Sequence, residues 1–295
     1  MWLGVLGVAV FALTLPMTRL ATGTAAAPQL SPWFVAFGRA TVAGGLSIAY
    51  LLATHSPRPA PAQWKPLALC AVCTTLGWPL LLGFALRSVT AGHAAVITAL
   101  LPLATAVAAA WLLRQRAPLG FWLCAVLGSA LVVSYALVRS QQSGHGFGLE
   151  WADLLLLCAV VLASLGYVFG AQVTGALGAE RVICWVCVMA LPITVPGALA
   201  TVPATTIAAS AWLGFAYVSV FSMWLGFFAW YRGLAIGGAL RVSQTQLLQP
   251  FLSILAAIPL LGEPLDLGTL GFAGAVVITV LIGKRLSRPI TAAAP

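Results

Sequence analysis

The stretch 238–264, GALRVSQTQLLQPFLSILAAIPLLGEP, begins as a polar helix, crosses Pro250 and ends in an apolar run. A related pattern occurs at 90–116, TAGHAAVITALLPLATAVAAAWLLRQR. Sliding the chain by 148 residues, about half its length, places Pro102 on Pro250. A hydrophobic helix with a proline near its middle therefore occurs once in each half, which indicates an internal repeat.

The composition is that of an integral membrane protein. The chain is 62% hydrophobic and 6% charged, with a mean hydropathy of +1.06, and a spanning helix needs about 20 apolar residues. Ala, Gly and Leu dispersed along every segment favour helices over a membrane barrel. The predicted fold class is all-α, integral membrane, with ten transmembrane helices. We expect them near 1–21, 32–53, 66–86, 91–113, 119–138, 151–173, 182–202, 208–231, 238–261 and 266–283.

The repeat divides the chain into two five-helix units. We expect the first repeat at 1–140, an inter-repeat loop at 141–148, and the second repeat with a short cytoplasmic tail at 149–295. Because each unit has an odd number of spans, the second enters the membrane from the opposite side. Inverted repeats of this kind place a substrate site near the midplane and permit alternating access.

The basic residues follow a membrane topology. With both termini in the cytoplasm, ten of them fall inside: Arg58, Lys65, Arg114, Arg116, Arg181, Arg232, Arg241, Lys284, Arg285 and Arg288. Three fall outside: Arg19, Arg87 and Arg139. This positive-inside bias explains the net charge of +9 without a nucleic-acid partner and predicts a multi-pass inner-membrane protein. All five carboxylates are expected at the surface, four of them outside: Glu150, Asp153, Glu263 and Asp266.

Several local patterns are assigned structural roles. Cys70 with Cys73, and Cys184 with Cys187, form C-x2-C pairs inside apolar spans, so we expect packing rather than a metal site. Residues 1–21 lack a basic n-region and are expected to be a retained first span. No Ser/His/Asp constellation is visible, so neither catalysis nor a cofactor is expected.

Polar residues inside the first spans are candidates for a substrate site. Arg39 lies about 10 Å into its span, where a charge costs about 2.5–3.5 kcal/mol. It therefore has either a partner or a task, or it snorkels to the outer surface. Thr74 and Trp78 lie near mid-membrane, as core filling or as the wall of a cavity.

The later spans add further candidates. His93 is either a packing histidine or a proton carrier, and Thr98 shares a face with Pro102. In the 238–261 span, polar side chains fall within a sector of roughly 120°, as interhelical contacts or as the lining of a substrate path. The candidates from the last spans are Tyr217, Ser219, Ser222, Trp224, Ser243, Gln246 and Gln249. Prolines expected to act as hinges are Pro16, Pro79, Pro102 and Pro250.

The chain resembles the EamA type of the drug/metabolite transporter superfamily. The resemblance rests on ten spans in two halves and on five motifs: Leu101-Pro102, Gln249-Pro250, Leu261-Gly262-Glu263-Pro264, the run Gly226–Gly233 and the opening Phe11–Pro16. Where the first repeat of this family often carries a Gly-Glu pair, this chain has Arg114-Gln115-Arg116. The resemblance implies a cavity among the 66–86, 91–113, 208–231 and 238–261 spans. Lining residues implied by it are Trp78, Thr98, Trp224, Gln246 and Gln249.

The predicted function is export of small metabolites, amino acids or related amphipathic compounds, across the inner membrane. The alternative is a phosphate-ester or nucleotide-sugar antiporter of the same fold, for which Arg39 is the candidate cation. We expect transport either by facilitated diffusion down a substrate gradient or by proton coupling through His93. The expected partners are a small-molecule substrate and the lipid bilayer, and the protein is a monomer or a homodimer.

Overall fold

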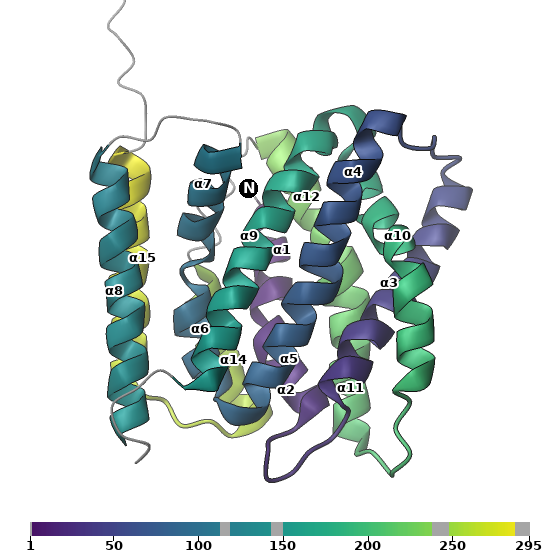
Figure 1. Cartoon of the computed structure of the whole chain (residues 1–295). Coiled ribbons are helices and arrows are strands. Elements are labelled where there is room, and N and C mark those ends of the chain that lie inside the picture. Colours follow the sequence, from purple (N-terminus) through teal and green to yellow (C-terminus); the bar gives the residue numbers. More distant parts are fainter. Residues whose placement is uncertain (1, 113–118, 143–149, 238–247, 287–295) are drawn as a thin grey trace, which may run out of the picture.

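The computed structural model describes residues 2–112, 119–142, 150–237 and 248–286, and the regular secondary structure within these ranges is helical. Figure 1 shows the helices standing side by side. In the first part of the chain they are α1 (Trp2–Ala12), α2 (Thr14–Thr22), α3 (Pro32–Ala53), α4 (Pro61–Cys70), the π-helical η1 (Ala71–Gly77), α5 (Trp78–Ser88), α6 (Ala91–Thr98), α7 (Leu101–Leu112) and α8 (Leu119–Gln142). In the second they are α9 (Trp151–Leu177), α10 (Ala179–Ala200), α11 (Ala209–Tyr217), the π-helical η2 (Val218–Leu225), α12 (Gly226–Gly237), α14 (Gln249–Leu261) and α15 (Leu267–Leu286).

Seven helical stretches in the described ranges are long and apolar enough to cross a membrane. They are Trp2–Thr22, Pro32–Ala53, Pro61–Ser88, Ala91–Ala109, Trp151–Leu177, Ala179–Ala200 and Ala209–Trp230. Three shorter apolar helices coincide with the remaining expected spans: Trp122–Val132, Gln249–Leu261 and Leu267–Thr279. The all-helical membrane class is thus confirmed, whereas the number ten and the repeat stay predictions.

The third span begins earlier than expected. Its first helix starts at Pro61, not near residue 66, because proline suits the first turn of a helix, where its missing N–H is not needed. With α5 it forms one stretch of 28 residues from Pro61 to Ser88.

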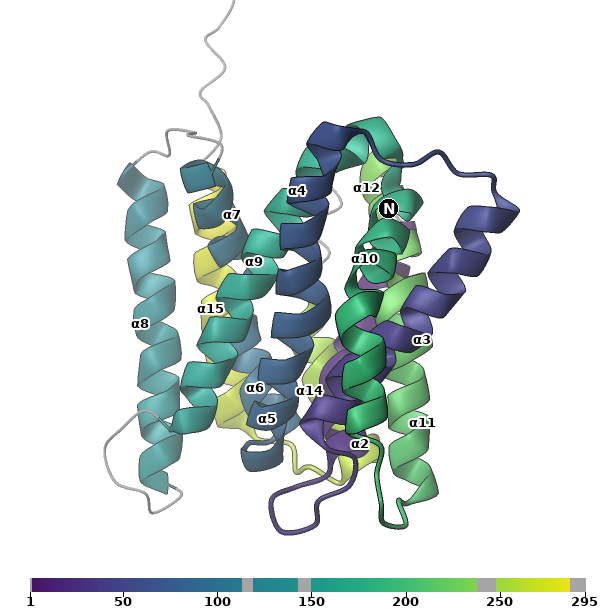
Figure 2. The same ribbon diagram turned by 45° about the vertical axis from the view of Figure 1, so that its right-hand side comes forward.

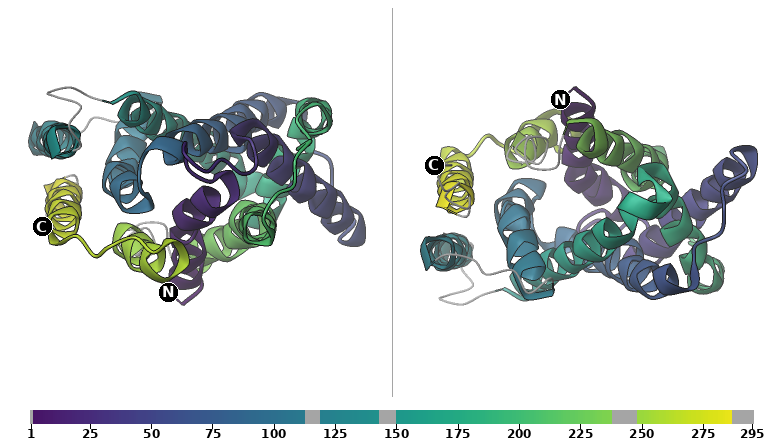
Figure 3. Two further views of the ribbon diagram at one scale, coloured as in Figure 1. Left: turned by 90° about the horizontal axis from the view of Figure 1, so that it is seen from below. Right: turned by 90° about the horizontal axis from the view of Figure 1, so that it is seen from above.

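The ends of the bundle differ in which loops they carry. The connections from α2 to α3, from α10 to α11 and from α14 to α15 lie at one end, here called the Glu263 end, whereas the N-terminus lies toward the other (Figure 1). Turning the molecule brings α3 and α10 forward (Figure 2). Seen along the bundle, α8 and α15 form a pair at one side (Figure 3).

Close packing of α3 against α10 joins the two halves of the chain. A Cβ added at Gly44 would lie 2.5 Å from Cδ2 of Leu191, and one at Gly197 would lie 2.6 Å from the ring of Phe37. Such small residues let helices approach closely in lipid, where packing contacts hold them together. The 148-residue slide that aligns the two halves also superimposes α3 on α10, so the equivalent helices of the expected repeats pack against one another.

Irregular backbone occurs next to three of the four expected hinge prolines. The helix breaks at Leu13, three residues before Pro16. The π-helical η1 ends at Gly77, two residues before Pro79, and α6 ends four residues before Pro102. A proline cannot donate to the carbonyl four residues earlier, which explains these positions. Pro250 lies in the first turn of α14, and the residues before Leu248 fall outside the described ranges.

Candidate functional site

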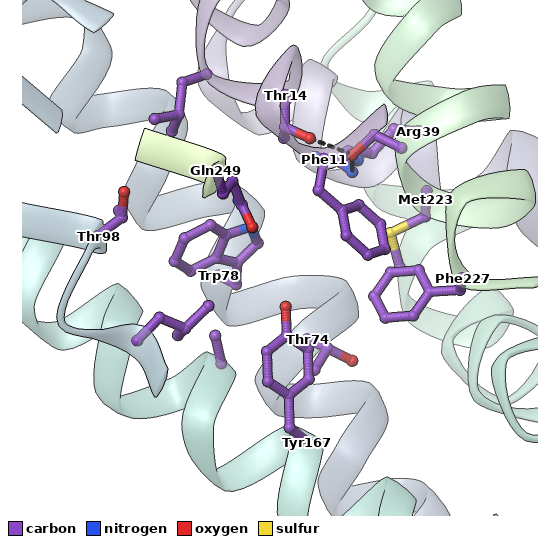
Figure 4. A pocket seen from close by; sticks show the side chains of 14 residues that line it. Phe11, Thr14, Arg39, Thr74, Trp78, Thr98, Tyr167, Met223, Phe227 and Gln249 are labelled. Carbon is purple, nitrogen blue, oxygen red and sulfur yellow. Dashed lines mark hydrogen bonds between the residues drawn. The ribbon is translucent and has the colours of Figure 1, made fainter. Parts of the chain in front are cut away.

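A cavity of about 30 Å³ lies inside the bundle, where irregular segments from both halves of the chain meet. Figure 4 shows its lining side chains, with Phe11, Met223 and Phe227 gathered on the side of Arg39, and Trp78 beside Gln249. The lining consists of Phe11, Thr14, Leu15, Arg39, Thr74, Trp78, Thr98, Leu101, Ala163, Tyr167, Ser222, Met223, Phe227 and Gln249. A ligand pocket usually measures about 300–1,000 Å³. The cavity in this structure therefore has room for a water molecule but not for a metabolite.

Six of the expected site residues are brought together here. They come from six different elements: Arg39, Thr74, Trp78, Thr98, Ser222 and Gln249. Trp78 is the first residue of α5 and directly follows the π-helical η1. Gln249 is the first residue of α14. Ser243 and Gln246 lie outside the described residues.

Arg39 is buried inside the protein, with 2% of its surface exposed. The snorkelling interpretation is therefore wrong. Its Nη2 donates to Oγ of Ser222 at 3.1 Å, and that Oγ lies 2.8 Å from Oγ1 of Thr14. Nε and Nη1 have no hydrogen-bond acceptor among the described residues. The polar chain from α2 through η2 to α3 thus holds the guanidinium at the cavity wall while leaving N–H groups available.

The hydroxyls of Thr74 and Thr98 are each bonded to a backbone carbonyl of their own span. Oγ1 of Thr74 donates to the carbonyl of Cys70 at 2.7 Å, and Oγ1 of Thr98 donates to that of Ala95 at 3.3 Å. Their lone pairs remain available as acceptors. These two residues can accept a hydrogen bond from a ligand without first losing one.

His93 does not line the cavity. Its Nε2 lies 2.6 Å from Oδ1 of Asp153, with side-chain exposures of 7% and 1%, and its ring contacts that of Tyr135. The expectation of a surface carboxylate at Asp153 is therefore wrong, because α6 packs against the first turn of α9, which carries Asp153. Its other oxygen accepts from the amide of Glu150 at 3.0 Å. A buried acid and base thus face each other across the two helices.

Tyr217 and Trp224, also expected at the site, point to other surroundings. The hydroxyl of Tyr217 donates to the carbonyl of Val10 at 3.0 Å. Trp224 packs against Phe228 and Tyr50, with ring centroids 4.8 and 6.3 Å away. Neither belongs to the cavity lining, to which η2 contributes Ser222 and Met223.

Several lining residues were absent from the sequence-based candidates: Phe11, Thr14, Leu15, Leu101, Ala163, Tyr167, Met223 and Phe227. Most are apolar, and an apolar residue inside a span has the same pattern whether it faces a cavity or the core. Thr14 carried a signal, since it stands beside the proline motif of the first span.

A second polar cluster fixes the Glu263 end. The carboxylate of Glu263 accepts from the backbone amides of Ala91 and Gly92 at 2.7 and 3.0 Å, at the start of α6. Nε of Arg19 lies 3.6 Å from the same carboxylate, and Nη1 of Arg19 donates to the carbonyls of Leu86 and Val89. Negative charge at a helix N-terminus is stabilising. This cluster therefore ties the loop after α14 to α2 and α6.

Known proteins resemble this chain in sequence and in fold. The model of the EamA-like transporter family matches residues 1–135 and 150–283. An uncharacterized transporter of Bacillus subtilis (strain 168), YdeK, is 37% identical over 287 residues, which cover 97% of this chain and 96% of that protein. A solved crystal structure shares the fold, with a TM-score of 0.66 at 18% identity over 99% of this chain and 98% of the other. The resemblance read from the sequence is confirmed. The protein is a membrane transporter, not an enzyme, and the chain belongs to the EamA-like transporter family.

Proposed function

We propose that the protein exports small metabolites, amino acids or related amphipathic compounds, by alternating access. The observation that carries the proposal is the buried cavity, because its lining combines aromatic walls with Arg39, Gln249 and threonine hydroxyls. Such a mixture suits a compound with an apolar body and a few polar groups. The cavity also draws its lining from both halves of the chain, as a site between two inverted repeats requires.

The irregular helices supply the moving parts in this proposal. The cavity of about 30 Å³ must widen to hold a metabolite, and breaks at Leu13 and before Pro102 are places where backbone can bend without losing regular hydrogen bonds. Pro16, Pro79, Pro102 and Pro250 are the proposed hinges. The two repeats, 1–140 and 149–295, would exchange conformations to open either end.

The orientation is part of the proposal. The positive-inside distribution of Lys and Arg supports cytoplasmic termini in a cell inner membrane. The Glu263 end then faces outward, and its contacts from Glu263 to Ala91 and Arg19 would be the closed outer barrier.

The proposed coupling site is the pair of His93 and Asp153. A buried imidazole and carboxylate 2.6 Å apart can share or exchange a proton. The pair lies beside Tyr135, whose hydroxyl is 3.1 Å from Oγ1 of Thr269, which in turn donates to Asp266 at 2.6 Å. Facilitated diffusion down a substrate gradient is the competing mode.

A panel of labelled amino acids in proteoliposomes tests the proposal, with and without a pH gradient. Uptake of aromatic or branched amino acids that depends on Trp78 supports export from this cavity. A panel on which the protein moves no amino acid would contradict the amino-acid assignment.

The second candidate is a phosphate-ester or nucleotide-sugar antiporter. The burial of Arg39 at the cavity wall favours an anionic substrate. A phosphate ester carries up to two charges, whereas Arg39 is the one cationic residue in the described lining. Phosphate exchange that survives Arg39→Ala would exclude this candidate.

A further inference from the structure

The guanidinium of Arg39 has hydrogen-bonding capacity that the described protein does not use. A guanidinium presents five N–H donors, and here only Nη2 has an acceptor, Oγ of Ser222 at 3.1 Å. Nε and both N–H groups of Nη1 have none in the described ranges. Leaving buried donors of a charged group without acceptors is unfavourable. An arginine kept in this state at a cavity wall points to a ligand that supplies the missing acceptors.

The lining also defines the charge of that ligand. Arg39 carries the only formal charge among the described lining residues, and none of them is Asp or Glu. An ammonium group in this cavity would therefore meet a cation with no carboxylate to neutralise it. A group with a single negative charge neutralises the site.

The remaining walls define the rest of the ligand. Phe11, Trp78, Tyr167, Met223 and Phe227 surround the cavity with rings and a thioether. The ring of Phe11 packs against that of Phe227 with a centroid distance of 5.0 Å. These walls favour an apolar or aromatic body.

We propose that Arg39 is the anion subsite of the cavity and that its ligands are monocarboxylates with an apolar or aromatic body. The carboxylate is required for binding, and an α-ammonium group is dispensable. This inference rests on the proposed transport function and narrows its substrate class. Ser222 and Thr14 act as positioning residues, because they orient the guanidinium without using its free N–H groups.

A series of phenyl compounds that carry different charged groups provides the test. The compounds are 3-phenylpropionate, phenylalanine, phenethylamine and phenyl phosphate, and binding to the purified full chain is measured by calorimetry. We expect 3-phenylpropionate to bind at least as tightly as phenylalanine, phenyl phosphate more weakly, and phenethylamine not at all. Tighter binding of phenethylamine or of phenyl phosphate than of 3-phenylpropionate would overturn the proposal.

Two arginine variants locate the effect at Arg39. We expect Arg39→Gln to weaken 3-phenylpropionate binding roughly tenfold or more, as for loss of a charge-assisted hydrogen bond, and Arg39→Lys to retain part of the affinity. The control is Arg232→Gln, since that side chain is 68% exposed, pairs with Glu180 at 3.8 Å and lies outside the cavity lining. Unchanged binding in Arg39→Gln would refute the subsite. The ligand series uses only the unaltered protein. It therefore tests the preference for a monocarboxylate even if Arg39→Gln does not fold.

Counterflow in proteoliposomes tests the anion subsite and the proposed transport function separately. If 3-phenylpropionate binds through Arg39 but is not moved, the transport proposal fails and the subsite stands. If amines are moved independently of Arg39, transport stands and the subsite is wrong.

Discussion

The hydroxyl of Ser253 on α14 donates a hydrogen bond of 2.7 Å to the carbonyl oxygen of Ala12 at the end of α1. Ala12 lies four residues before Pro16, which has no N–H to offer it. A side chain from the second half of the chain thus satisfies a backbone acceptor that a proline in the first half leaves open. Because Ser253 is fully buried, no water competes for this bond.

The Ser253–Ala12 bond can be measured with a double-mutant cycle. We expect Ser253→Ala to lower the free energy of unfolding by about 1 kcal/mol. Pro16→Ala restores the N–H that the Ala12 carbonyl lacks, so Ser253→Ala should cost less in that background. Thermal unfolding in detergent measures all four proteins. The control is Ser219→Ala, whose hydroxyl donates to its own helix at Phe215, and its effect should be additive with Pro16→Ala.

The Glu263 carboxylate is expected to stabilise the start of α6. Glu263→Gln keeps one acceptor oxygen but loses the charge that faces the helix N-terminus and Arg19. We therefore expect it to lower the free energy of unfolding by about 1 kcal/mol. Glu263→Ala, which removes both acceptors, should lose more. Arg19→Gln should destabilise the Glu263→Gln variant less than it destabilises the wild-type protein, because the ion pair is already broken in that variant. Additive effects would mean that Arg19 and Glu263 act independently, despite their separation of 3.6 Å.

His93 and Asp153 should behave as one unit in transport. If the pair carries the proton, His93→Gln and Asp153→Asn will each abolish the response of transport to a pH gradient, and the double variant will add nothing. Substrate counterflow, which needs no gradient, should continue in all three. The measurement is initial uptake with the gradient present and after its collapse. If uptake by the wild-type protein is the same with and without the pH gradient, the protein is a facilitator and the coupling proposal is wrong.

Two glycines of α9 give a matched test of helix packing. A Cβ at Gly166 would overlap the methyl group of Thr74 and lie 3.0 Å from Cβ of Cys73, whereas Gly175 has open space around it. We expect Gly166→Ala to destabilise the protein by about 1–3 kcal/mol, as overpacking does. Gly175→Ala should be neutral or slightly stabilising, since alanine favours helices. Because Thr74 lines the cavity, Gly166→Ala should also weaken ligand binding, and equal effects of the two substitutions would contradict this packing.

The sequence by itself determined the membrane class, the approximate positions of the helices and the family. These follow from hydrophobic runs of about 20 residues and from motifs around prolines, which are local properties of the chain. It also identified Arg39, Trp78 and Gln249 as candidates, because polar or large aromatic side chains stand out within apolar spans.

Only the tertiary structure decided which of these residues meet. His93 and Arg39 are both lone polar residues in apolar spans, yet one pairs with Asp153 and the other lines the cavity. Asp153 follows a loop in the sequence, and only the packing of α6 over α9 buries it. The π-helical turn in η2 shifts the side-chain register, so Ser222 faces inward and Trp224 does not. Sequence periodicity assumes regular helices, whereas this site is built where the helices are irregular.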